Sequence, residues 1–321
     1  MSEAALPFNP LRHDLYSPDD LFAGFDPGDP TSYARCADMA ILSYFARMRA
    51  NSSMNSGAST LEALHDNSIS KAIQVLTVKF PTVVAIMGGH GMKRSDPAYT
   101  DVAHIAHELA KSGFLLTSGG GPGAMEATHL GALLSKRSVA EVDAAIAVLK
   151  TVDSLPANMG NLVKPDGKID AEIAKMLHAW ITPALKIRNE VPVTDRAISL
   201  GVPTWLYGFE PTTPFATHCG KYFQNSIRED GLVTLGVGGI IYAEGSAGTV
   251  QEIFQDAAQN YYATFCPMIF LSSAAKDGEH FWEKKLPVRP LIEALLGSRA
   301  GFSKVLFSER ADEVIAFIKE Q

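Results

Sequence analysis

The sequence predicts an α/β protein: a Rossmann-like, doubly wound parallel sheet with an N-terminal helical extension. Three observations predict this fold. Short apolar runs rich in β-branched residues alternate with segments of helical periodicity. Several of these runs are apolar throughout, as expected of strands covered on both faces. Glycines stand where such runs end and helices begin, an order typical of sheets that bind ligands at the carboxyl ends of their strands.

The chain divides into an N-terminal part and a main domain. Residues 1–30 are rich in Pro, Asp and Gly and show no period, so we expect an arm that lies on the body or on a partner subunit. Apolar residues return at helical spacing over 32–50 and 61–76, with the polar linker NSSMNSGAS between them. We therefore expect an N-terminal arm and helices over 1–78 and a Rossmann-like nucleotide-binding domain over 79–321.

The first half of the main domain repeats the order strand, glycine turn and helix. We expect strands at 82–87 (TVVAIM) and 114–117. A helix follows the first strand, with Asp96 as its N-cap, Pro97 in its first turn and Gly113 at its end. Another helix follows the second strand over 124–134.

The second half resumes this alternation after an interruption. The segment 138–190 contains two expected helices around a stretch rich in Pro, Gly and Asn, and we interpret it as an insertion or lid. Beyond it we expect strands at 198–207, 239–243, 268–271 and 305–307, and helices at 215–230, 249–260 and 312–319.

Composition excludes several classes of function. Lys and Arg number 28 against 35 Asp and Glu, and this net charge of −7 argues against a nucleic-acid binder that relies on a general basic surface. No run approaches the roughly 18 apolar residues that a membrane span needs, and the N-terminus has no export signal. We expect a cytoplasmic protein. Its three cysteines match no zinc spacing, so we expect no metal site.

Three glycine turns are candidates for binding a phosphate group. Glycine lets the backbone turn tightly and approach a ligand, and the N–H groups of a following helix attract an anion. Because parallel strands end at one edge of a sheet, three such turns together favour a nucleotide site. The candidate residues are Gly88, Gly89 and His90 in the first turn, Gly119, Gly120 and Gly121 in the second, and Gly245, Ser246, Ala247, Gly248 and Thr249 in the third.

Two common nucleotide sites do not fit these turns. A dinucleotide fold needs an acidic residue at the end of its second strand to bind the ribose. Here that strand ends in Thr117, Ser118 and Gly119, so a dehydrogenase is disfavoured. The chain also contains no G-x-x-x-x-G-K-[ST] sequence, which disfavours a P-loop kinase or NTPase.

Two segments carry a resemblance to a known family. They are AIMGGHGMKRSDPAYTDVAHIAHELAKSGFLLTSGGGPGAMEATHLGA and, about 110 residues later, IIYAEGSAGTVQEIFQ. Together they resemble the Lonely Guy (LOG) family, long described as possible lysine decarboxylases. The run at 119–126 is most similar to the branch of bacterial nucleotide 5′-monophosphate nucleosidases. The resemblance covers about 83–271, apart from 138–190, and leaves the N-terminal helices unexplained.

The resemblance implies a function and a catalytic pair. Known members are phosphoribohydrolases, which release a free base from a nucleoside 5′-monophosphate without a cofactor, and they form dimers or larger homo-oligomers. Their catalytic pair is an arginine near a helix end and the last glutamate of the signature PGGxGTxxE. Glu252 matches that glutamate, and Arg228, 24 residues earlier, is the candidate arginine. The resemblance places no nucleic acid or membrane among the partners.

The signature departs from the family pattern at two positions. Glu244 stands where proline is usual, and Ser246 stands where the second glycine is usual. A carboxylate beside a phosphate repels it unless the carboxylate is neutral, paired or turned away. Glu244 therefore predicts either a basic partner or a ligand less anionic than a monophosphate.

The chemistry of glycoside cleavage supports the role of Glu252. Breaking an N-glycosidic bond builds positive charge on the ribose, and a nearby carboxylate stabilises this charge or takes a proton from the attacking water. Arg228 could clamp the phosphate or ribose, or hold Glu252, because its guanidinium pairs bidentately with either anion.

Structural interpretations of the same residues remain open. Thr249 and Glu252 also fit a capping box, and Arg228 could complement the C-terminal dipole of its helix. Met125 and Glu126 could line the base or ribose pocket, or serve as core filler and first-turn cap. A protein that binds nucleotides without turning them over, as a sensor or carrier, is the main alternative function, and a phosphoribosyl transferase is a weaker one.

Overall fold

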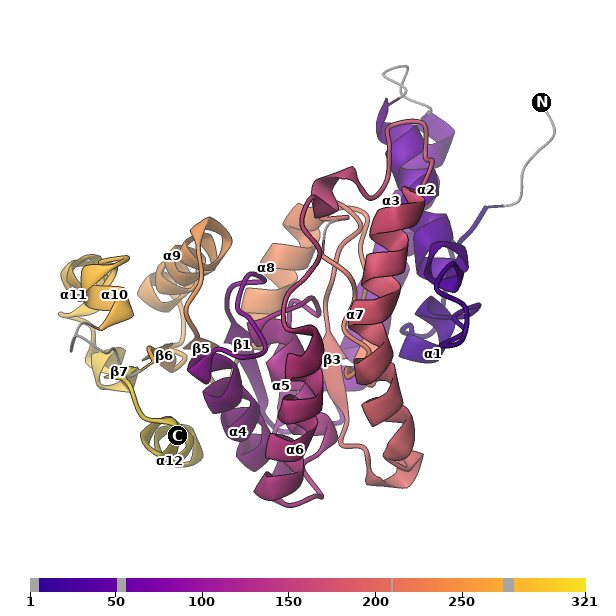
Figure 1. Ribbon diagram of the computed structural model, residues 1–321. Helices are drawn as coiled ribbons and strands as arrows, with labels where there is room; N and C mark the ends of the chain where they lie inside the picture. Colours follow the sequence, from indigo (N-terminus) through magenta and orange to yellow (C-terminus); the bar gives the residue numbers. More distant parts are fainter. Residues whose placement is uncertain (1–5, 51–55, 209, 274–279) are drawn as a thin grey trace.

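A seven-stranded sheet, all of whose strands run parallel, forms the centre of the protein (Figure 1). We describe it from a computed structural model that covers residues 6–50, 56–208, 210–273 and 280–321. The strand order is β4-β3-β2-β1-β5-β6-β7. The strands are β1 (Val83–Met87), β2 (Leu115–Ser118), β3 (Ser199–Gly201), β4 (His218–Cys219), β5 (Ile240–Tyr242), β6 (Met268–Leu271) and β7 (Val305–Ser308). The predicted Rossmann-like sheet is confirmed.

The chain reverses its direction of travel across the sheet at β1. From β1 it moves outward through β2 and β3 to β4, and it then returns to β5 on the other side of β1. β1 and β5 pair in parallel, with Met87 opposite Tyr242 at their carboxyl ends. Because the helices after these two strands leave in opposite directions, a crevice opens between the strand ends, where ligands bind in sheets of this kind.

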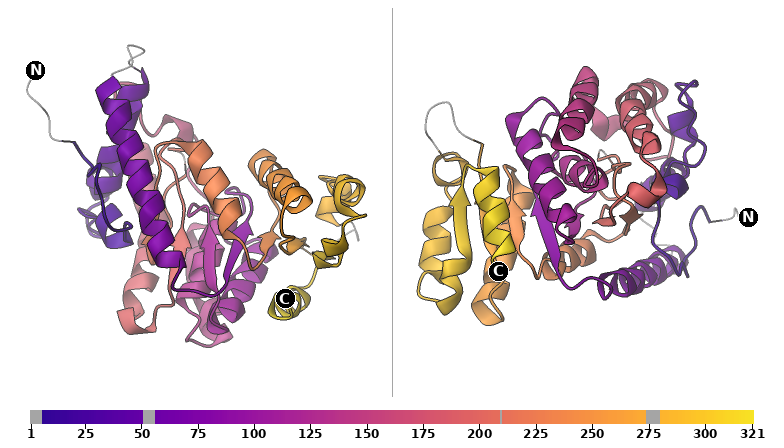
Figure 2. Two further views of the ribbon diagram at one scale, coloured as in Figure 1. Left: turned by 180° about the vertical axis from the view of Figure 1, so that it is seen from behind. Right: turned by 90° about the horizontal axis from the view of Figure 1, so that it is seen from below.

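Helices cover both faces of the sheet (Figures 1 and 2). One face carries α4 (Pro97–Lys111), α5 (Ala124–Leu133) and α12 (Ala311–Lys319), with α6 (Val139–Leu149) and α7 (Ala171–Glu190) beside them. The other face carries α3 (Ser56–Thr77), α8 (Asn225–Leu235) and α9 (Ala247–Tyr262), and α10 (Phe281–Lys284) and α11 (Arg289–Leu296) flank α9. No helix in the described part of the chain is both long and apolar enough to cross a membrane.

Two elements of the second half differ from the prediction. The helix expected at 215–230 begins only at Asn225, and the short strand β4 occupies His218–Cys219 instead. The strand expected at 198–207 ends at Gly201, shortly before Pro203, which has no N–H for a sheet ladder. The two helices expected within 138–190 are present as α6 and α7.

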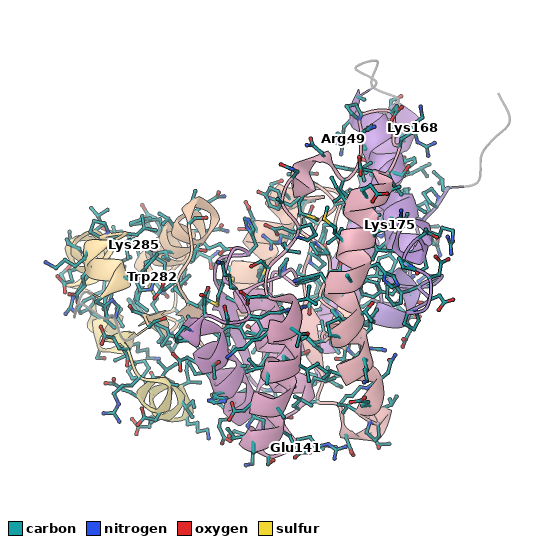
Figure 3. All side chains as sticks on the ribbon, viewed as in Figure 1. Arg49, Glu141, Lys168, Lys175, Trp282 and Lys285 are labelled. Carbon is teal, nitrogen blue, oxygen red and sulfur yellow. The ribbon has the colours of Figure 1, made fainter. Side chains whose placement is uncertain are left out.

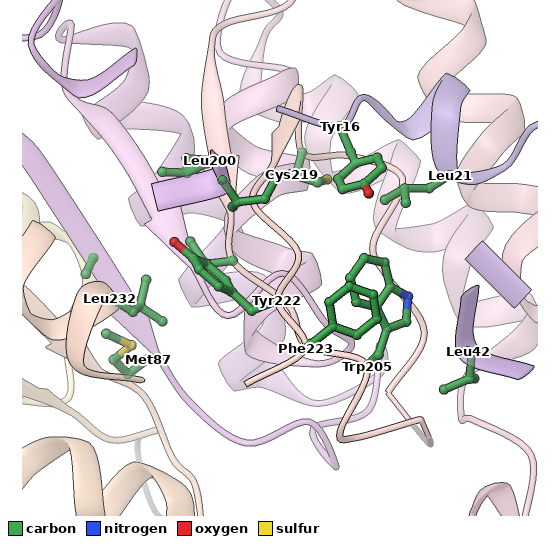
Figure 4. Packing of buried hydrophobic residues seen from close by; sticks show 14 of the residues in the cluster. Tyr16, Leu21, Leu42, Met87, Leu200, Trp205, Cys219, Tyr222, Phe223 and Leu232 are labelled. Atoms are coloured by element: carbon green, nitrogen blue, oxygen red, sulfur yellow. The ribbon is translucent and has the colours of Figure 1, made fainter. Parts of the chain in front are cut away.

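The N-terminal extension shares its core with the main domain. Its helices are α1 (Pro18–Leu21), α2 (Ala37–Ala50) and α3, and residues 51–55 of the predicted linker lie outside the described residues. Figure 4 shows Tyr16, Leu21 and Leu42 of the extension around Trp205 and Phe223 of the main domain. The described part of the predicted arm therefore lies on the body of the protein.

Two buried carboxylates of the extension hold segments that lead into the site. Asp38 of α2 forms an ion pair with Lys221, whose Nζ lies 2.8 Å from Asp38 Oδ1, and it also accepts a hydrogen bond from Trp205 Nε1. Asp66 of α3 accepts hydrogen bonds from the N–H groups of Phe223 and Gln224, at 3.0 and 2.9 Å. These two residues immediately precede α8, so the extension fixes where that helix begins.

Candidate active site at the switch point of the sheet

The three predicted glycine turns meet at the carboxyl edge of the sheet. The first turn, after β1, contacts the third turn, after β5, because the Gly89 N–H donates to the Glu244 carbonyl at 2.9 Å. It also contacts the second turn, after β2, since the Ala124 N–H approaches the Gly89 carbonyl at 3.4 Å. Gly123, at the N-cap of α5, has φ +67°, a left-handed conformation that favours glycine. The turns thus form one contiguous surface.

Arg228 reaches this surface from α8. It is the fourth residue of the helix, so the predicted position near the helix C-terminus is wrong, and with it the suggested dipole role. Its side chain is buried, and Nε donates to the Val202 carbonyl at 2.8 Å. Its guanidinium lies directly over Gly119, where a Cβ would overlap Nη2 and would lie 2.6 Å from Met125 Sδ. Gly119 therefore provides the space that Arg228 occupies.

Glu252 faces Arg228 from α9. The helix begins at Ala247 with Ser246 as its N-cap, so Glu252 is its sixth residue and the predicted capping box with Thr249 is wrong. Glu252 Oε1 lies 3.9 Å from Arg228 Nη1, an ion pair too long for a hydrogen bond. Burial raises the pKa of Glu252 to about 7, with Arg228 lowering it and the carboxylates of Glu229 and Glu210 raising it further.

Glu210 completes this group and was not predicted. It lies in the loop after β3, and its Oε1 is 3.0 Å from His90 Nδ1 in the first turn. If Gly121 carried a Cβ, that atom would lie 3.4 Å from Glu210 Oε2, so the carboxylate lies at the second turn. The loop carries no periodic pattern, but it follows a strand end at the ligand-binding edge, and that position is the signal that could have identified Glu210.

A large pocket lies beside this group, in the crevice between β1 and β5. It has a volume of about 710 Å³ and extends to the end of β6 and to α10. Trp282 anchors α10 there by donating from Nε1 to the carbonyls of Tyr242 and Leu271, and Figure 3 shows it beside Lys285. The lining includes Gly89, His90, Gly91, Met92, Asp96, Glu244, Gly245, Ser246, Lys284 and Lys285.

The predicted site residues therefore divide into two neighbouring groups. Gly89, His90, Gly245 and Ser246 line the large pocket, and Ala247 lines the pocket adjoining it. Arg228, Glu252, Gly119, Gly121 and Met125 gather on the α8 side of the same edge. The remaining four belong to neither group. Gly88 packs against Ala124 and Ala243, and Gly120 packs against Pro203. The Thr249 Oγ1 lies under Gly245, and Gly248 faces open space.

Glu244 and Glu126 have hydrogen-bond partners that the sequence did not predict. Glu244 Oε1 accepts a hydrogen bond from the Ser273 N–H at 2.9 Å, and Glu244 makes no ion pair with a described residue. Glu126 is not a cap, but it is among the residues that line a pocket of about 340 Å³. Its two oxygens accept hydrogen bonds from Arg94 Nη2 and Nε at 2.7 and 2.9 Å, and one also accepts from Tyr99. This buried pair fixes the segment after the first turn to α5.

Comparisons with known proteins add little about the ligand. No family model matches the chain, and no curated protein matches it. Among solved structures the chain is similar to the molybdenum cofactor binding protein from the phototrophic bacterium Rippkaea orientalis, with a TM-score of 0.39 and 14% sequence identity. The match covers 74% of this chain and 96% of that chain. Within the described residues, no group of three or more His, Cys, Asp or Glu side chains could hold a metal ion.

Proposed function

We propose that the protein hydrolyses the N-glycosidic bond of a nucleoside 5′-monophosphate, producing a free base and ribose 5-phosphate. The observation that carries this proposal is the buried pair of Arg228 and Glu252 beside three glycine turns at the switch point. The two residues are 24 positions apart in the sequence and come from different helices. Their meeting at the ligand-binding edge is what the proposed catalysis requires.

The first turn of α9 is suited to the phosphate. Its first N–H groups have no acceptor within the helix, and the side chain of Ser246 makes no capping bond. These N–H groups and the helix dipole attract an anion. The pocket in front of them contains Lys284 and Lys285 but also Asp96 and Glu244, so the charged side chains balance and the backbone must supply the attraction.

Glu252 is suited to the reacting carbon. It lies five residues beyond Ala247, about 7.5 Å further along the helix axis, a separation that suits a ribose 5-phosphate extending from the helix N-terminus. Its carboxylate would take a proton from the water that attacks C1′ and stabilise the positive charge on the sugar. Arg228, held by the Val202 carbonyl, would keep that carboxylate in place.

Incubation with a panel of purine and pyrimidine nucleoside 5′-monophosphates tests the proposal. We expect release of free base and ribose 5-phosphate from at least one of them, measured by chromatography. Tight binding without release of base would contradict the proposal and would support the alternative, a nucleotide-binding sensor or carrier. No binding and no release would exclude both.

Gly119→Ala is expected to lower the rate of base release by about 100-fold, because the added methyl group displaces the Arg228 guanidinium. The variant should remain folded, since the atoms displaced are the ends of two side chains. Gly231→Ala is the matched control. Gly231 lies in α8, the helix that carries Arg228, and a methyl group added there would meet nothing within 4 Å. Equal rates for the two variants would show that the position of Arg228 does not matter.

A further inference from the structure

The pair of His90 and Glu210 joins two loops across the candidate site. His90 lies in the turn after β1 and Glu210 in the loop after β3, two strands away across the sheet. Glu210 is largely buried, with 16% of its side chain exposed, whereas His90 is 45% exposed and borders both the 710 Å³ pocket and a smaller one of about 340 Å³. A buried carboxylate therefore orients an imidazole that ligands can reach.

This pair belongs to the same electrostatic group as the catalytic carboxylate. Glu210 is close enough to Glu252 to raise the pKa of that carboxyl. Met125 links Glu210 to Arg228. A Cβ at Gly121 would lie 2.9 Å from Met125 Cε and 3.4 Å from Glu210 Oε2. A Cβ at Gly119 would lie 2.6 Å from Met125 Sδ and would overlap Arg228 Nη2. Glu210 thus connects the two groups, since it contacts the His90 imidazole directly and its charge acts on the Glu252 carboxyl.

Hydrolysis of a nucleotide needs an acid as well as a base. When the bond between C1′ and the base nitrogen breaks, its electron pair passes to the base, which is a poor leaving group as an anion. Protonation of the base at another ring nitrogen makes its departure easier, and a positioned acid typically contributes 10² to 10⁴-fold to such a step. Glu252, acting on the water, cannot supply this proton at the same time.

We propose that His90, oriented by Glu210, is the general acid that protonates the leaving base. In this step the proton on His90 Nε2 passes to a ring nitrogen of the base and the C1′–N bond breaks. Water adds to C1′ and its proton passes to Glu252. The products are the neutral base and ribose 5-phosphate; His90 recovers a proton from solvent, and Glu252 releases its proton to solvent. This inference rests on the proposed hydrolysis and adds the residue that acts on the leaving group.

The local environment favours the protonated imidazole that the step requires. The hydrogen bond to Glu210 raises the pKa of His90, against the effect of partial burial. Because Nδ1 faces the Glu210 carboxylate, Nε2 is the ring nitrogen that would pass a proton to a ligand. Partial exposure of the ring allows its proton to be replaced after each turnover.

Two substrates with different leaving groups test the inference. One is the preferred purine nucleoside 5′-monophosphate, and the other is 4-nitrophenyl β-D-ribofuranoside 5-phosphate, whose nitrophenolate departs without protonation. We expect His90→Asn and Glu210→Gln to lower kcat for the nucleotide by about 100-fold or more. Both variants should change kcat for the nitrophenyl substrate by less than about threefold, because that step needs no acid.

Two further variants complete the design. Glu252→Gln should lower kcat for both substrates, because water attacks C1′ in each. His104→Asn is the matched control, since His104 pairs with Asp143 at 2.7 Å on the surface away from the site, and both activities should be unchanged. Thermal melts of all variants establish that they are folded.

The outcomes separate this inference from the proposed function. Equal losses on both substrates in His90→Asn would overturn the acid role, and so would no loss on either. If the unmodified protein releases neither base nor nitrophenolate, the proposed hydrolysis fails and the inference fails with it. If Glu252→Gln is inactive while His90→Asn is fully active on the nucleotide, the hydrolysis stands and the acid is another group.

Discussion

Glu252→Gln is expected to lower the rate of base release by about 1,000-fold or more, because an amide can neither take a proton from water nor neutralise a positively charged sugar. Quantifying free base from the preferred nucleoside monophosphate measures the effect. Asp256→Asn is a matched control on the same helix, since Asp256 also has a buried carboxyl, which accepts a hydrogen bond from Tyr242 at 2.7 Å. Substantial activity in Glu252→Gln would contradict the catalytic assignment.

The same residue predicts how activity depends on pH. Burial raises the pKa of Glu252 to about 7, so the carboxylate form required for catalysis becomes dominant only above neutral pH. We expect kcat/KM of the unmodified protein to rise between about pH 6 and 8 as Glu252 ionises, and to fall at higher pH, where His90 loses the proton that the leaving base requires. A profile that is flat across this range would show that ionisation of Glu252 does not limit the reaction.

Removing the carboxyl should also change how stability depends on pH. The folded protein holds the Glu252 proton up to pH 7, whereas the unfolded chain releases it near pH 4.5. Between these values the native state binds more protons, so the free energy of unfolding falls as pH rises. Glu252→Gln removes this pH dependence, so between pH 5 and 8 the difference in unfolding free energy should shift in favour of the variant by up to about 3 kcal/mol. Melting curves of both proteins across this range measure the difference, and parallel curves would contradict it.

Glu126→Ala is expected to destabilise the protein by about 3–5 kcal/mol, because it leaves the Arg94 guanidinium buried without its carboxylate partner. Arg94 is only 1% exposed, and its ring contact with Trp180, 4.1 Å to the centroid, does not replace an anion. Urea unfolding with both proteins at one pH measures the loss.

Two further variants define what Glu126 contributes. Combining Arg94→Met with Glu126→Leu should recover much of the loss, since apolar residues avoid the cost of a lone buried charge. Asp312→Ala, which breaks the exposed pair with Arg310, should change the free energy of unfolding only slightly, because water screens that pair. A loss of that small size in Glu126→Ala would show that water reaches Arg94 or that another group neutralises it.

The central strands could be predicted because burial on both faces leaves a strong pattern. VVAIM and MIFL are apolar throughout, and β1 and β6 lie within a residue of their predicted positions. β4 could not be found in this way, because it is two residues long and consists of His218 and Cys219. The start of α8 was also missed, since the residues before this helix are held by Asp66, 158 residues before Gln224. A contact with a residue so far away leaves no local signal.

The candidate site could be predicted in its parts but not in its arrangement. Parallel strands end at one edge, so the three turns had to meet there. The separation of Arg228 and Glu252 in sequence gave no distance between them, because that distance depends on how α8 packs against α9. Glu210 was missed because its position is set by the fold of an irregular loop, which Trp205 and Thr212 tie to Asp38.

The anchoring of the N-terminal extension determines when the site can form during synthesis. Asp38 leaves the ribosome 183 residues before Lys221, and Asp66 precedes Phe223 by 157 residues. Until those partners emerge, both carboxylates must remain hydrated, and the helices that carry them cannot dock. Contacts between residues so far apart in sequence form late because the intervening chain must first be ordered. We therefore expect the first helices synthesised to be among the last to pack, completing the extension and positioning Arg228 in one step.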